Sequence, residues 1–351
     1  MSPLKILKSA LRNWIYFILV GFIFLAQFGS ELIVKKPYDV LVPSVSISKE
    51  ETQKLQQYYQ QLDQSLKESL KKPENLAWVT GMGLLMIGLL ALGCILLSVW
   101  GVGFLLRPVS GTERVPWGVG DVCRVAILAI FFGQVFAIFG LSLAHFFFKV
   151  KIENESFLML FATLFVDVFS FLFILYFMYR RKQVSVSTIG LTQDRFFSNI
   201  GIGLMGYLSS LPVFVALLLA VLGIAHLLHY DPPPQPIQEI FFGEKANETL
   251  LIATFFVALA APFFEEVFFR GFLYNALKHW MSPVQALLIN SLLFAWLHAN
   301  LIGFVPILFL GILLTLLYEK TGSLVSSITV HMLHNSVMVG FVFVIKALVG
   351  T

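Results

Sequence analysis

Long apolar runs separated by short polar segments dominate the chain. A membrane-crossing helix needs about 20 mostly apolar residues, and on this rule the sequence predicts about nine of them. The predicted spans are 14–34, 77–106, 121–148, 156–179, 200–229, 248–277, 283–298, 302–318 and 323–348. The seventh and eighth of these, 283–298 and 302–318, are short. The pattern therefore predicts an all-α fold, a polytopic bundle of transmembrane helices.

The first run resembles both a signal peptide and an anchor, since Lys5, Lys8 and Arg12 precede it. It is about 20 residues long, and no clear small-x-small cleavage site follows, which favours an uncleaved anchor. No organelle-targeting segment precedes the run. We therefore expect an integral protein of a bacterial inner membrane.

The segment 35–76 is the one long polar stretch between spans. Ser48 and Glu51 form a capping-box pattern, and Pro73 favours an end to any helix there. The sequence predicts an amphipathic helix over about 48–72, lying on the membrane or against the span ends. A partner-binding or substrate-gating role is the alternative. The apolar residues of this predicted helix recur at helical spacing and are Leu55, Tyr59, Leu62, Leu66 and Leu70.

The distribution of Arg sets the expected orientation. Cytoplasmic loops of membrane proteins are rich in Lys and Arg. With the N-terminus in the cytoplasm, seven of the eight Arg fall on the cytoplasmic side, and Arg270 lies within a span. The C-terminus and the helix at 48–72 are then extracytoplasmic.

The composition supports one membrane domain. Hydrophobic residues make up 58% of the chain and charged residues 13%, against about 25% charged residues in soluble proteins. This excludes a soluble globular domain, disorder and a coiled coil. The net charge of +4 without a basic stripe gives no reason to expect a nucleic-acid partner. Cys94 and Cys123 lie in apolar runs, so neither a disulfide framework nor a thiolate metal site is expected.

Three charged residues lie inside the sixth predicted span. Ionisable residues at membrane depth are costly and usually functional. Glu266 and Arg270 are four residues apart and share a helix face, so they are expected to pair. Glu265 sits about 100° around the helix and can face another neighbour. Pro262 lacks a backbone donor and predicts a kink that opens space for a water.

Further polar residues lie in other spans. His298 ends the seventh, and His331 and Asn335 share a face of the ninth. Buried carboxylates suit water activation, and imidazole and amide groups can stabilise an oxyanion. Asp167 in the fourth span is expected to be a hydrogen-bonded or protonated buried acid. His334 is expected to be a neighbour of the site rather than a member.

The same residues also match a catalytic zinc site in number, since Glu265, His298 and His331 would supply three ligands. The His-Glu-x-x-His helix of common zinc proteases is absent. The residues alone leave a metal-bound and a metal-free water open.

These segments resemble the CPBP family of intramembrane proteases, also called the Abi or CAAX-protease family. The resemblance covers about 185–348, a protease-like core, and leaves an N-terminal membrane region, 1–180, unexplained. The motifs are Glu265-Glu266-Val-Phe-Phe-Arg270, Phe294-Ala-Trp-Leu-His298 and His331-Met-Leu-His-Asn335.

The resemblance implies an endopeptidase that hydrolyses a peptide bond of a membrane-associated protein or peptide. We favour a metal-free glutamate mechanism without a cofactor, and zinc stays the alternative. The implied roles are water activation by Glu265, water positioning by His298, oxyanion binding by His331 and Asn335, and support by Glu266 and Arg270.

Two other function classes fit the same polar cluster. One is a non-catalytic membrane scaffold or bacteriocin-immunity-type protein, and the other is an ion-coupled transporter. The Glu266–Arg270 pair would suffice to hold helices together, which leaves His298 and Asn335 surplus. No internal repeat supports a transporter. The complete set therefore favours the peptidase.

Overall fold

The computed structural model describes residues 61, 64–101, 103–104, 115–148, 155–230, 241 and 247–349. Within these residues the chain forms helices and no strand. The expected span 14–34 and most of the expected helix 48–72, with Ser48 and Glu51, lie outside them. The described end of that helix, 64–69, is helical and stops at a turn before Pro73, as predicted.

The first half of the described chain contains four long helices. Short π-helical turns extend two of them. They are α3 (Pro73–Leu96) with η1 (Leu97–Gly101), α5 (Val119–Phe148), α6 (Glu155–Tyr176) with η2 (Phe177–Lys182), and α7 (Phe196–Leu227), which follows the 3-10 turn η3 (Val186–Ile189).

The second half begins with one long segmented helix and ends with three simpler ones. The segments are α9 (Asn247–Phe255), η4 (Phe256–Ala260), α10 (Ala261–Glu266), η5 (Val267–Tyr274) and α11 (Asn275–Leu277). The remaining helices are α12 (Pro283–Leu297), α13 (Phe304–Thr321) and α14 (Leu324–Val349).

The described helices confirm an all-α, multi-pass membrane protein. Seven of them are long and apolar enough to cross a bilayer, and Pro283–Leu297 is a shorter apolar helix. These eight coincide with the second to ninth predicted spans. The outward side chains agree, since Trp78, Leu84 and Ile87 of α3 are 64–72% exposed. Large apolar side chains of this kind are favourable in the hydrocarbon of a bilayer and costly to expose to water.

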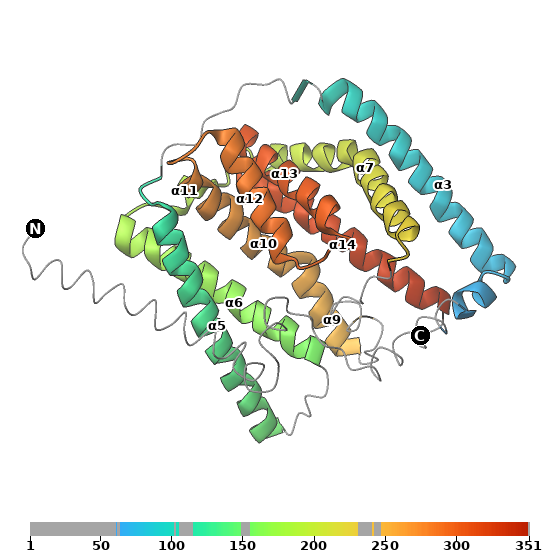
Figure 1. The fold of residues 1–351 in the computed structure, drawn as a ribbon, viewed down its shortest axis with the longest axis horizontal. Helices are drawn as coiled ribbons and strands as arrows, with labels where there is room; N and C mark the ends of the chain where they lie inside the picture. The colour runs from blue at the N-terminus through green and yellow to red at the C-terminus, as the bar shows by residue number, and fades with distance from the viewer. Residues whose placement is uncertain are drawn as a thin grey trace, which may run out of the picture.

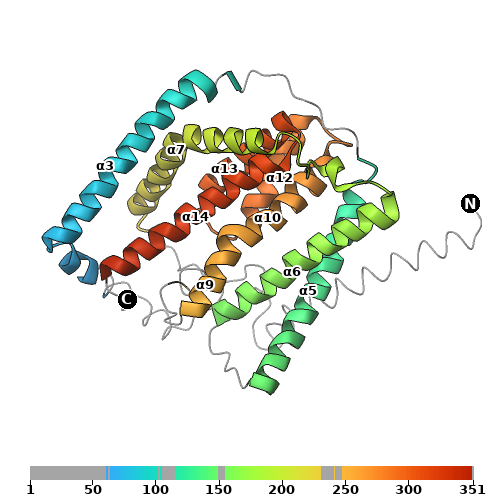
Figure 2. The same ribbon diagram turned by 180° about the vertical axis from the view of Figure 1, so that it is seen from behind.

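The helices that carry the candidate residues lie in the middle of the molecule. Figures 1 and 2 show α3 on one side and the α5–α6 pair on the opposite side. Between them lie α10, α12, α13 and α14, and α14 packs against both α7 and α10. The candidate site is therefore enclosed by helices on several sides.

Small residues let two pairs of helices approach closely. A Cβ atom on Gly133 of α5 would lie 2.7 Å from the backbone of Val166 in α6. A Cβ atom on Gly203 of α7 would lie 2.8 Å from the carbonyl oxygen of Ser326 in α14. Transmembrane helices pack through such small residues because lipid provides no hydrophobic drive between them. The two contacts fix α6 and α14, which carry Asp167 and His331.

Candidate functional site

The segmented helix from α9 to α11 changes its hydrogen-bond register just before the two glutamates. In η4 the backbone N–H of Ala261 donates to Phe256, five residues back. The next N–H in this register would serve Val257, but that position is Pro262, which has none. The expected effect of Pro262 thus takes the form of a π-helical turn. The carbonyl of Val257 is left without a donor from its own helix.

Asn335 supplies that donor from α14. Its side-chain Nδ2 donates to the Val257 carbonyl oxygen at 2.9 Å. A primary amide carries two N–H bonds, so one remains for another acceptor. Asn335 therefore joins α14 to the helix of the glutamates, a contact that its place in the sequence did not reveal.

The predicted pair of Glu266 and Arg270 is confirmed. Arg270 Nη1 lies 2.6 Å from Glu266 Oε1, and both side chains are fully buried. Arg270 Nη2 also donates to the carbonyl of Gly311 in α13 at 3.3 Å. The guanidinium lies 4.4 Å from the ring centroid of Phe294. These contacts hold the pair rigidly between three helices.

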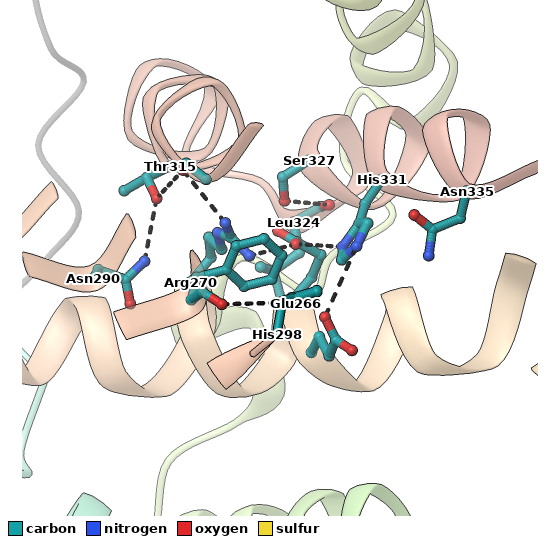
Figure 3. A network of polar contacts seen from close by, with 12 residues as sticks. Glu266, Arg270, Asn290, His298, Thr315, Leu324, Ser327, His331 and Asn335 are labelled. Carbon is teal, nitrogen blue, oxygen red and sulfur yellow. Dashed lines mark hydrogen bonds and ion pairs between the residues drawn. The ribbon is translucent and has the colours of Figure 1, made fainter. Parts of the chain in front are cut away.

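Two further polar residues extend this contact and were missed in the sequence. Thr315 donates through its hydroxyl to the Gly311 carbonyl at 2.8 Å. Asn290 of α12 donates to the Thr315 hydroxyl at 3.2 Å. Both are fully buried and both appear in Figure 3. The only signal in the sequence is an uncharged polar residue inside an apolar span.

His331 bridges the two neighbouring glutamates. Its Nδ1 lies 2.9 Å from Glu266 Oε1, and its Nε2 lies 3.8 Å from Glu265 Oε2. The Glu266 carboxylate, paired with Arg270, is only an acceptor, so Nδ1–H donates to it. This contact between His331 and Glu266 (Figure 3) fixes the ring and directs Nε2 towards Glu265.

Glu265 has the most open position in this cluster. Its side chain is 23% exposed, against 0% for Glu266 and 2% for His331. Within the described part of the chain, its buried Oε2 has no hydrogen-bond partner. A partly accessible carboxylate with an available acceptor oxygen can bind and deprotonate a water.

His298 lies beside the cluster without direct polar contact to it. It caps the C-terminus of α12, and its Nδ1 lies 2.7 Å from the Phe294 carbonyl oxygen. The Phe294 ring contacts both imidazoles, with centroid distances of 4.6 Å to His298 and 5.5 Å to His331. Direct polar contacts thus join Glu265, Glu266, Arg270 and His331, whereas His298 and Asn335 adjoin them through Phe294 and Val257.

The structure also places His334 and Asp167, two further polar residues of the predicted spans. His334 packs against Tyr207 and Phe214 of α7, at centroid distances of 6.0 and 5.1 Å, so it faces away from the glutamates. Asp167 of α6 was expected to be a hydrogen-bonded or protonated buried acid. It shares a face of α6 with Phe171, which packs against Phe263 and Phe264 of α10.

The zinc alternative finds no ready ligand set. Among the residues that the structure describes, no three His, Cys, Asp or Glu side chains are arranged to hold a metal ion. Both nitrogens of His331 face carboxylates, and His298 is turned to a backbone carbonyl. In this arrangement Glu265, His298 and His331 do not fit zinc.

The comparisons with known proteins agree with the resemblance. Residues 247–337 match the family model of the type II CAAX prenyl endopeptidase Rce1-like proteins. The match includes every residue from Glu265 to Asn335, and it does not include α6. The chain is also 32% identical over 97 residues to UPF0177 protein YaiH of Lactococcus lactis subsp. lactis, strain IL1403. That match covers 26% of this chain and 39% of the relative. No solved structure matches the chain.

Proposed function

We propose that the protein is an intramembrane endopeptidase that hydrolyses a peptide bond with a water activated by Glu265. One observation carries the proposal. Arg270, Glu266 and His331 form a connected chain of polar groups that are 0–2% exposed, and this chain ends at Glu265, which is 23% exposed. Polar groups at membrane depth are costly, so an ordered series that ends at an accessible carboxylate favours chemistry over helix packing.

The proposed reaction follows from the positions of these groups. Glu265 takes a proton from water, and the water oxygen attacks the scissile carbonyl carbon. The C=O electron pair moves to the oxygen, which becomes an oxyanion. Glu265 then passes its proton to the amide nitrogen as the C–N bond breaks. The products are a new carboxyl group and a new amine.

The neighbouring groups have supporting roles in this scheme. His331 donates Nδ1–H to Glu266 and presents Nε2 to the reacting groups; in the imidazolium form, with both nitrogens protonated, Nε2–H stabilises the oxyanion. Asn335 contributes the amide N–H that Val257 does not use. Glu266, held by Arg270, orients His331. His298 positions the water from the far side of Phe294. The mechanism uses no cofactor.

We further propose a bacterial inner membrane as the location, with a cytoplasmic N-terminus, and a membrane-associated protein or peptide as the substrate. The segment 185–348 forms the protease-like core, and 1–180 is an N-terminal membrane region. The matched family is described by its prenylated substrates. For this chain we propose a substrate that is associated with the membrane, and we propose no prenyl group on it.

The test compares wild type with Glu265→Gln, which keeps the shape of the side chain and removes the base. Membranes from cells that express either form are analysed by mass spectrometry for newly formed protein termini. Glu68→Gln is the matched control, because Glu68 is 62% exposed and lies outside the predicted spans. Wild type and the control should produce the same termini, and Glu265→Gln should produce none. Identical termini from Glu265→Gln would favour the non-catalytic scaffold or immunity-type alternative.

A further inference from the structure

Several buried oxygen atoms of α5, α6 and α10 lack a hydrogen-bond partner, and α6 packs against both of the other helices. Within the described part of the chain they include Asp167 Oδ2 and Ser170 Oγ of α6, Gln134 Oε1 of α5 and Glu265 Oε2 of α10. Buried polar atoms in proteins nearly always have a partner, which is often an ordered water. Buried oxygen atoms of this kind on helices that pack together therefore point to bound water.

The packing of α6 places Asp167 at the level of the Glu265 carboxylate. Phe171 contacts Phe263 and Phe264, at ring distances of 5.5 and 5.6 Å. Six residues later Phe177 contacts Phe272, at 5.8 Å. The two helices therefore run side by side in the same direction. Asp167 precedes Phe171 by about one turn.

The directions of the side chains bring the two carboxyl groups together. Side chains on a helix point back towards its N-terminus. Both side chains therefore lean the same way, and the longer Glu265 side chain reaches further back, towards the level of Asp167. The other titratable or charged groups near Glu265 are His331 of α14, at 3.8 Å, and Arg270 of its own helix.

We infer that Asp167 and Glu265 together hold the attacking water, which makes Asp167 a catalytic residue contributed by a helix outside the family match. Asp167 forms a hydrogen bond to one side of the water and thereby directs its lone pair at the substrate carbonyl. Glu265 takes the proton from the other side. Ser170, three residues after Asp167 on the same face, offers a second contact to the water. This inference rests on the proposed function.

The kinetic test uses Asp167→Val, which removes the polar group, and Asp167→Asn, which keeps a hydrogen-bonding oxygen. The substrate probe is a fluorogenic peptide that spans the first cleavage site found in wild-type membranes. Asp167→Val should lower kcat by about 100-fold and leave KM within about twofold, because Asp167 contacts the water and not the peptide. Asp167→Asn should recover part of the loss.

The matched control is Thr254→Val in α9, which also removes a buried side-chain oxygen that has no hydrogen-bond partner. It should keep the wild-type kcat. Asp167→Val should also melt close to or above the wild-type temperature, because it replaces a carboxyl group that is costly to bury with an apolar side chain. A wild-type kcat in Asp167→Val would overturn the inference, and so would equal losses of kcat and melting temperature in both Asp167 variants.

A second measurement does not depend on peptidase activity. Electron cryomicroscopy of wild type and Asp167→Val in lipid nanodiscs should show an ordered water between Asp167 and Glu265 in the first and not in the second. A wild-type map without this water would overturn the inference. If wild type and Glu265→Gln produce the same termini while the water is present, the proposed function fails and the water site stands.

Discussion

Glu265 and Glu266 are adjacent in the sequence and have opposite surroundings. Glu266 is fully buried, and a single oxygen, Oε1, receives both Arg270 and His331. Glu265 is partly exposed, and its Oε2 lies 3.8 Å from His331. Consecutive residues on a helix point about 100° apart, so one helix presents them to different partners. The comparison separates a carboxylate that holds the site together from one that is available for chemistry.

The difference also explains why the cluster needs both acids. A carboxylate that is fixed by a cation is a poor proton acceptor, because the cation stabilises its ionised form. It serves well as an anchor for His331. The second carboxylate escapes this constraint because the basic side chain that it pairs with is an imidazole, at 3.8 Å, and not a guanidinium.

The sharpest test of the comparison is the loss of the general base. Glu265→Gln should reduce cleavage by about 100-fold or more, since general-base catalysis typically contributes about 10²–10⁴-fold. Its melting temperature in detergent should stay close to that of wild type, because a neutral amide is less costly to bury than a carboxylate. Peptide cleavage and thermal melts measured on one preparation check both. A large drop in melting temperature would assign Glu265 to the fold.

The next largest effect is expected at the other end of the cluster. Arg270→Ala leaves Glu266 buried without its cation, which should cost roughly 3–5 kcal/mol of stability. Activity should fall together with stability in thermal melts and cleavage assays. The double variant Glu266→Gln with Arg270→Met should melt closer to wild type, because no uncompensated charge remains. An Arg270→Ala protein that is inactive but melts like wild type would place Arg270 in the chemistry.

A smaller effect is expected where Asn335 meets Val257. Asn335→Ala leaves the Val257 carbonyl without a donor, at a cost of about 1–3 kcal/mol. In a Pro262→Ala background the helix regains an N–H at position 262, so Asn335→Ala should cost less there. A double-mutant cycle of unfolding free energies measures the coupling. Equal costs in the two backgrounds would show that Asn335 acts through another contact.

The smallest expected effect is that of metal removal. With Glu265 as a metal-free base, chelators should leave the cleavage rate unchanged, and elemental analysis should find no stoichiometric zinc. The matched variant is His298→Ala, which should not alter the metal content. One zinc per chain that is lost in His298→Ala would establish the metal-bound water.

Local rules were sufficient for part of this structure. Helix length and composition predicted the eight described apolar helices, and four-residue spacing predicted the Glu266–Arg270 pair. Neither rule reveals which helix faces meet. That depends on close approaches at single small residues such as Gly133 and Gly203. The contact between Asn335 and Val257 and the proximity of Asp167 to Glu265 therefore had no signal in the spacing of the sequence.

The two π-helical turns around α10 give the glutamates a rotational setting of their own. A π-helical turn holds about one residue more than an α-helical turn, and one residue corresponds to about 100° of rotation. Glu265 and Glu266 belong to α10, a segment of six residues between η4 and η5. A shift of one residue between π and α register would turn this short segment while α9 and α11 stay in place. The direction of both carboxylates can thus be retuned, in evolution or by protein engineering, without altering the loops at either membrane surface.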